Sequence, residues 1–225
     1  GTGFEVGTDS SLKMELEFQV RDLILQKSNF QTQIFNLQDQ INLELPRKIS
    51  ISKAKIEALK ADIEAIKNAP DDKVRIKGIA LSEPKEIGAM IKTVSNEVGD
   101  NNFISIGEYK GVEIRLRIDD FGKNIVLNFG KSDTERELGL DNTSNGKKVL
   151  ASLDDIETQL SSTEQVLSMY ENNLVIAKKT VGEKFPQEAE LAEKQSRLDE
   201  INAVFDSRER NKIHQQKVQN NNYVR

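Results

Sequence analysis

The stretch LKMELEFQVRDLILQKSNFQTQIFNLQDQI, residues 12–41, decides the fold. Apolar side chains recur in it at alternating steps of four and three residues, and Lys27 holds the one slot of the series that is not apolar. The apolar positions are Leu16, Val20, Leu23, Phe30, Ile34, Leu37 and Ile41. This heptad series predicts a long helix with a coiled-coil seam, which begins near the capping residues Asp9 to Ser11 and ends before Pro46.

The same rhythm returns directly after Pro46 and twice more toward the C-terminus. It predicts helices over residues 10–43, 47–68, 149–181 and 187–206, with Ser52 and Thr163 as polar members of two seams. The connections near Leu45-Pro46-Arg47 and Gly182 to Pro186 are short. Short connections favour antiparallel neighbours, so we expect two antiparallel coiled-coil hairpins.

Between residues 73 and 145 the period changes from helical to alternating. Apolar and polar residues alternate over 74–76, 112–118 and 125–129, as in half-buried strands. The segment from Pro84 to Val98, with Gly99 at its end, is typical of an amphipathic helix. The expected fold class is therefore α+β, with a small antiparallel sheet and one helix inserted between the two hairpins.

These patterns divide the chain into five segments. The opening Gly1-Thr2-Gly3 lacks an initiator methionine, and we interpret residues 1–9 as a linker left from a longer polypeptide. The first hairpin takes residues 10–70, the inserted domain 71–145 and the second hairpin 146–206. Residues 207–225 are rich in Asn, Gln, Lys and Arg, which have little to bury, so we expect a disordered tail.

Composition limits the chemistry that this chain can perform. Cysteine is absent and His214 is the one histidine, which excludes disulfides, thiolate metal sites and Cys/His nucleophilic pairs. We therefore expect no metal or other cofactor and a cytoplasmic protein. No run approaches the roughly 20 apolar residues that cross a bilayer, so no membrane contact is expected. The net charge of −5 argues against a general nucleic-acid coat.

Several residues of types used in catalysis have simpler interpretations. The acidic pairs are adjacent on a strand or stand early in a helix, His214 has no partner nearby in the polar tail, and the glycine-containing segments lack a phosphate-loop ending. Lys27 sets the seam register or extends from the seam into solvent. The residues considered are Asp119, Asp120, Asp154, Asp155, His214, Gly107, Gly111 and the run Asn145-Gly146-Lys147-Lys148. We predict no catalytic residue among them.

One basic strip is a candidate for nucleic-acid contact. Lys73, Arg75 and Lys77 share one face of a predicted strand, and Arg115 and Arg117 share a face of another. If the two strands are neighbours, these five side chains form a row suited to DNA phosphates. The alternative is a solvated sheet face, whose positive charge is balanced by Glu113 and Asp119.

Three phrases of the sequence resemble a known family. They are residues 12–41 with the following LPRKI, then IGEYKGVEIRL at 106–116, and KFPQEAELAEKQSRLDEINAVF at 184–205. The order and wording resemble the region after the helicase core of very large Swi/Snf-like helicases. Such helicases are often fused to adenine-specific DNA methyltransferases and are carried by mobile elements and phages. The resemblance covers most of the chain and implies an ATPase motor N-terminal to this segment.

Taken together, these features favour a non-catalytic accessory scaffold. The resemblance implies that it positions DNA or other domains of the same polypeptide, which would be its partners. The alternative is a structural coiled-coil module that associates with itself and does not contact nucleic acid, and the oligomeric state stays open. An enzyme whose chemistry lies in the inserted domain is the third hypothesis.

Overall fold

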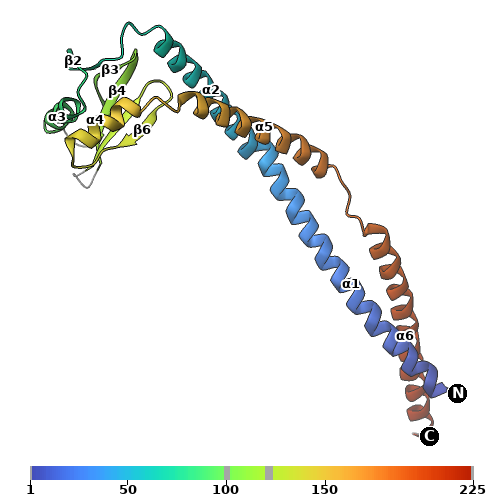
Figure 1. Cartoon of the computed structure of the whole chain (residues 1–225). Helices are drawn as coiled ribbons and strands as arrows, with labels where there is room; N and C mark the ends of the chain where they lie inside the picture. The colour runs from blue at the N-terminus through green and yellow to red at the C-terminus, as the bar shows by residue number, and fades with distance from the viewer. Residues whose placement is uncertain (1, 99–101, 120–123, 224–225) are drawn as a thin grey trace. The chain divides into compact units, whose positions relative to one another are not determined.

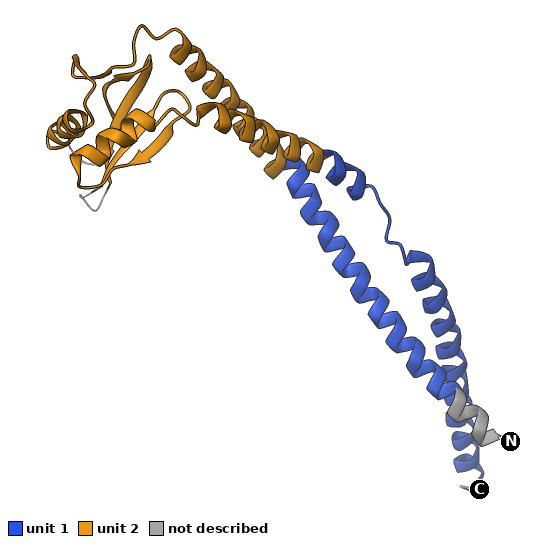
Figure 2. Ribbon diagram, in the orientation of Figure 1, with its two compact units in different colours: residues 1–42, 175–225 blue, residues 43–174 orange. Residues whose placement is uncertain are grey.

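The computed structural model describes residues 2–98, 102–119 and 124–223. Figure 1 labels the helices and strands along the chain, and Figure 2 shows the two compact units into which the chain divides. Unit 1 takes residues 1–42 and 175–225, and unit 2 takes residues 43–174. The fold class is α+β, as predicted, with long helices and a six-stranded antiparallel sheet. Each unit is described by itself below.

Unit 1 is built on a pair of long helices, α1 (Thr2–Asp39) and α6 (Glu188–Asn222). Their buried seam consists of Leu16, Val20, Leu23, Leu191 and Leu198. The pair is antiparallel, because the middle of α1 meets the start of α6 while the beginning of α1 meets later turns of α6. The heptad seam of residues 12–41 therefore packs against the last helix of the chain.

Polar and aromatic contacts fix the register of this pair. Lys27, the one polar member of the first seam, lies 2.8 Å from the Glu188 carboxylate, and the rings of Phe30 and Phe185 lie 5.7 Å apart between centroids. The Lys13 ammonium lies 5.2 Å from the centroid of the Phe205 ring. A lysine ammonium in a seam needs either a carboxylate partner or contact with solvent, and here Glu188 supplies the carboxylate.

The predicted turn at Leu45-Pro46-Arg47 is wrong, because these residues are helical. A five-residue π-helix, η1 (Gln40–Glu44), leads into α2 (Leu45–Lys67), with Pro46 in its first turn. Proline has no N–H to donate and its ring clashes with the carbonyl four residues earlier, and the wider π-turn accommodates both defects. The two predicted hairpins are not confirmed, since α1 pairs with α6 and α2 lies beside α5 (Ile156–Val181).

The ends of the chain also differ from the expectation. Residues 2–9 belong to α1 and do not form a linker, and residues 207–222 continue α6 and are exposed. Arg, Glu, Lys and Gln are good helix formers, so this stretch is helical without burying a face. In the part of the chain that the structure describes, no helix is both long and apolar enough to cross a membrane.

Unit 2 contains one antiparallel sheet with the strand order β2-β1-β3-β4-β5-β6. The alternating segments predicted at 74–76, 112–118 and 125–129 are confirmed as strands, whereas three further strands were missed. The bounds are β1 (Val74–Ile76), β2 (Ile79–Leu81), β3 (Ile104–Tyr109), β4 (Val112–Ile118), β5 (Ile125–Phe129) and β6 (Thr134–Glu137). The three missed strands are β2, β3 and β6.

Two helices cover one face of this sheet, where one was expected (Figure 1). Helix α3 (Pro84–Ser95) confirms the predicted amphipathic helix, and α4 (Asn142–Ala151) is the additional one. The two helices approach closely, since a Cβ at Gly88 or Gly146 would overlap backbone atoms of the opposite helix. Val149 and Leu153 belong to the core of the sheet, so the inserted domain extends beyond its predicted boundary at residue 145. The helix end predicted at Gly99 lies outside the described residues.

The α1–α6 seam makes a testable prediction about stability. Leu23 is 4% exposed in the seam, so Leu23→Asp buries an unpaired carboxylate and should lower the free energy of unfolding by about 3 kcal/mol. Asn29→Asp is the control, because Asn29 is exposed on the same helix, and its effect should stay within about 0.5 kcal/mol. Urea unfolding followed by circular dichroism measures both, and equal midpoints would contradict the seam.

Candidate functional site

The sheet order separates the two halves of the predicted basic strip. Strand β3 lies between β1 and β4, so the strand of Arg75 is not a neighbour of the strand of Arg115 and Arg117. Glu108 on β3 stands opposite Arg75 on one side and opposite Glu113 on the other. Lys77 falls in the turn between β1 and β2 with a φ of 51°. The five basic residues therefore do not form one continuous row.

Arg75 is held by an acid from its own chain segment. Its two guanidinium nitrogens donate to the two carboxylate oxygens of Asp71, at 3.0 and 2.6 Å. These bonds, together with one from the backbone N–H of Lys73, lower the pKa of Asp71 to about 2. A bidentate pair of this kind occupies the donors that a phosphate would need.

Arg115 and Arg117 are engaged in the same manner. Arg115 donates to Glu113 at 3.1 Å, to the carbonyl oxygen of Gly130 at 2.7 Å, and to the Asp133 carboxylate. Arg117 donates to Glu135 at 3.2 Å, and its guanidinium carbon lies 5.2 Å from the centroid of the Phe103 ring. The outer face of the sheet thus carries a lattice of ion pairs.

This lattice also covers the neighbouring strand. Val126 and Asn128 on β5 stand opposite Arg117 and Arg115, and they are 4% and 8% exposed. Cross-strand partners share a face, so the arginine stems shield them from solvent. The balanced-face alternative describes this geometry better than a phosphate row, with Glu113 in the balancing role expected of it.

The remaining sequence candidates hold structural hydrogen bonds or are exposed. Asp155 accepts a hydrogen bond from Arg136 at 3.1 Å, Asn145 pairs with both backbone groups of Gly139, and His214 is exposed on α6. Asp120 lies outside the described residues. Within the described ranges, no group of three His, Asp or Glu side chains is placed to hold a metal ion.

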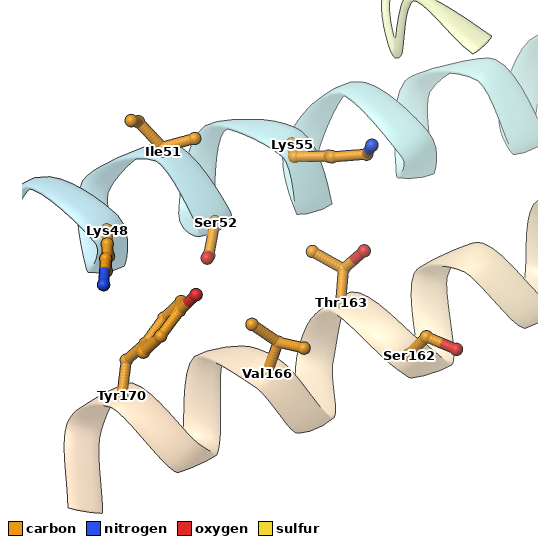
Figure 3. Close-up of a pocket in the computed structure, with 8 residues that line it drawn as sticks. All are labelled: Lys48, Ile51, Ser52, Lys55, Ser162, Thr163, Val166 and Tyr170. Atoms are coloured by element: carbon orange, nitrogen blue, oxygen red, sulfur yellow. The ribbon is translucent and has the colours of Figure 1, made fainter. Parts of the chain in front are cut away.

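The clearest concave site is a groove between α2 and α5, and all the residues that line it belong to unit 2 (Figure 3). It has a volume of about 290 Å³. Four residues on one face of α2 line it, together with four residues of α5. They are Lys48, Ile51, Ser52 and Lys55 on α2, and Ser162, Thr163, Val166 and Tyr170 on α5. The two helices run in opposite directions past it (Figure 3).

The groove exists because small polar residues occupy the seams at this level. Ser52 is 7% exposed and stands in the heptad slot between Ile49 and Ile56, while Thr163 stands between Leu160 and Leu167. A leucine or isoleucine in these slots would fill the space between the helices. The sequence does contain the signal, as two polar interruptions of otherwise apolar seams, but it does not show that the two meet.

The chemistry of the groove is cationic and partly apolar. Lys48 places its ammonium 5.6 Å from the centroid of the Tyr170 ring, and Lys55 follows two helical turns later. Ile51 is 57% exposed and Val166 is 38% exposed at its edge. No carboxylate is among the described residues that line it. The groove can bind a group that is apolar in its centre and negatively charged at its flanks.

Comparison with known proteins identifies no relative, since no protein-family model, no curated protein and no solved structure matches the chain.

The ion-pair lattice predicts how the chain responds to DNA. At about 50 mM salt, where phosphate contacts are strongest, the unmodified chain should bind labelled duplex weakly or not at all. Glu113→Gln with Asp133→Asn and Glu135→Gln removes the carboxylates that pair with Arg115 and Arg117, and it should create measurable binding that salt abolishes. Fluorescence anisotropy measures both. If the unmodified chain binds DNA tightly and Arg115→Glu with Arg117→Glu abolishes that binding, the basic strip is a DNA-binding site after all.

Proposed function

We propose that residues 43–174 form a non-catalytic scaffold that holds the α+β domain in a fixed orientation for neighbouring domains of a larger polypeptide. The observation that carries this proposal is that one element, the β5–β6 hairpin, is hydrogen-bonded both to α2 and to the segment that leads directly into α5. Because both connections are tied to the same hairpin, the sheet cannot pivot on either connection alone. A positioning role requires such a double attachment.

The attachment of α2 is a buried aspartate in the middle of the helix. Asp62 is 3% exposed, and its two carboxylate oxygens accept hydrogen bonds from the backbone N–H groups of Lys131 and Ser132, each at 2.9 Å. Hydrogen bonds to an ionised acceptor are stronger than neutral ones. A buried carboxylate that lost them would be left unpaired in the interior, at a cost of several kcal/mol.

The attachment of α5 runs through an arginine on β6. Arg136 donates to the backbone carbonyl of Ser152 at 3.0 Å and to the Asp155 carboxylate at 3.1 Å, just before α5 begins. Ser152 is fully buried, and its hydroxyl donates to the Val149 carbonyl at 2.6 Å. The segment that enters α5 is thus bonded to β6 through Arg136 and to the end of α4 through Ser152.

The context of this scaffold comes from the resemblance in sequence. A region that follows a helicase core has neighbouring domains to position, and the ion-paired sheet face favours protein contacts over DNA as the means. The groove between α2 and α5 offers ammonium and hydroxyl groups suited to binding. The proposal for residues 43–174 does not depend on which motor or methyltransferase precedes them.

The double attachment predicts a measurable loss of rigidity. The chain has no cysteine, so the cysteines introduced by Lys53→Cys on α2 and Lys92→Cys on α3 are the only positions at which a thiol-reactive spin label attaches. Their distance distribution should be narrow in the otherwise unmodified chain. Asp62→Ala, which removes two charge-assisted hydrogen bonds worth about 1.5–3 kcal/mol each, should broaden it. Pulsed electron paramagnetic resonance measures the distribution.

The matched control is Asp72→Ala, because Asp72 is an exposed aspartate in the segment after α2. It should leave the distribution narrow. A broad distribution in the unmodified chain would overturn the scaffold proposal. An unchanged narrow distribution in Asp62→Ala would show that the buried carboxylate does not hold the sheet.

A second candidate function, self-association, is favoured by an apolar stripe on α1. Met14, Phe18, Leu25 and Phe35 are 68%, 74%, 59% and 63% exposed. Their heptad register is offset by two residues from the α1–α6 seam, which places them about 200° around the helix from it. Helix α1 therefore carries one apolar face against α6 and a second one that faces solvent in the single chain.

Sedimentation velocity tests this candidate. If the stripe pairs two copies of the chain, the sedimentation coefficient should rise with concentration, because heptad stripes associate through apolar burial. Phe18→Glu with Leu25→Glu should abolish the rise. Gln215→Glu with Gln216→Glu adds the same charge on exposed positions of α6 and should preserve it. A concentration-independent monomer in the unmodified chain would exclude self-association.

A further inference from the structure

We propose that the groove between α2 and α5 is a docking site for a third helix, one that carries an apolar stripe flanked by carboxylates. The inference rests on the proposed scaffold function, since it names the chemistry by which the scaffold would hold a neighbouring domain or protein. The occupant is a helix because the groove lies between two antiparallel helices, and a ridge of side chains on a third helix fits such a groove.

The centre of the site is the space left by Ser52 and Thr163. A coiled coil is held by large apolar side chains that enter holes of the facing helix, and here the hole is open from outside. Its volume of about 290 Å³ is larger than one leucine side chain needs and smaller than most drug-sized pockets. Figure 3 shows the hydroxyl of Ser52 and the ring of Tyr170 directed into the space between the helices.

The edge of the site extends the apolar contact beyond this space. Ile51 on α2 and Val166 on α5 line the groove and are 57% and 38% exposed. Exposed apolar groups beside a cavity mark a binding surface more than scattered ones do. A leucine or phenylalanine of the third helix would bury them together with the space over Ser52.

The positive charge of the site favours a partner helix that carries negative charge. Lys48 and Lys55 stand seven residues apart on α2, a rise of about 10.5 Å along the helix axis. The Tyr170 ring holds the Lys48 ammonium at the mouth of the groove. Since no described lining residue is a carboxylate, the partner must supply them. Two glutamates or aspartates one heptad apart, beside the apolar stripe, match this spacing.

A peptide titration tests the inference with defined probes. The first probe is a fluorescent helical peptide of roughly three heptads with leucine stripe positions and glutamates flanking them, and the second has lysines in place of the glutamates. The 225-residue chain should bind the acidic peptide and bind the basic one at least about tenfold more weakly, since each pairing of like charges is unfavourable. Fluorescence anisotropy gives both affinities.

Variants of the chain separate charge from shape. Lys48→Glu with Lys55→Glu should weaken the acidic peptide at least about tenfold, since it reverses both partner charges. Lys53→Glu with Lys60→Glu makes the same change in net charge on exposed positions of α2 that do not line the groove, and it should change the affinity less than about twofold. Ser52→Leu fills the space without changing charge, and it should also weaken binding at least about tenfold while it raises the melting temperature.

Four results would overturn the inference. The first is equal affinity for the two peptides, and the second is an affinity that neither Ser52→Leu nor Thr163→Leu changes. The third is that neither peptide binds. The fourth is that decanoate binds in the groove and the peptides do not compete with it, which would assign the groove to a small anionic amphiphile. Failure here is distinct from failure of the scaffold, because the spin-label distances report the attachments at Asp62 and Arg136. Those attachments do not line the groove.

Discussion

The architecture of unit 2 depends on a carboxylate placed where a helix of this kind would ordinarily carry an apolar residue. Asp62 stands on the buried side of α2 and is satisfied by two backbone N–H groups of the β5–β6 turn. Gly130, with a φ of +68°, permits this approach, because a Cβ there would press against the Asp62 carboxylate. An apolar side chain at position 62 could slide against the sheet, whereas a carboxylate with two directed acceptors fixes both the position and the rotation of the helix.

Polar residues within the long seams serve opposite purposes in the two units. In unit 1, Lys27 interrupts the apolar series and forms an ion pair with Glu188. This ion pair sets the register of α1 against α6 and bridges the two helices at this position. In unit 2, Ser52 and Thr163 are both short, and neither reaches across to fill the space between α2 and α5. The loss of packing there costs stability, since an unfilled seam lacks dispersion and burial. A binding surface is a physical reason for keeping short polar residues in slots that leucine would fill.

The sequence predicts those features whose cause is local. Alternating apolar residues in β1, β4 and β5 identify the strands, and Pro84 in the first turn together with the helical period identifies α3. Strand β6 reads Thr-Glu-Arg-Glu and has no apolar alternation, because Glu135 pairs with Arg117 in the ion-pair lattice and Arg136 bonds to the segment just before α5. Helix α4 begins in a run that suggests a turn, and it is started by Asp141, whose carboxylate accepts from the Ser144 N–H at 2.8 Å. The pairing of the long helices could not be predicted, because a heptad pattern indicates which face of a helix is buried but does not indicate which other helix covers that face.

The order of strands explains why the five basic residues do not form one continuous row. Alternating cations on a strand specify a face, but the charge of that face also depends on neighbouring strands, and β3 brings Glu108 between the two halves. Each of the three arginines then meets an acid supplied by its own strand, by β6 or by an adjoining loop. The lysines of the α2–α5 groove have no carboxylate beside them in its described lining. Attraction for an anionic partner is therefore stronger on the helix pair than on the sheet, since charges already paired within the fold attract little at a distance.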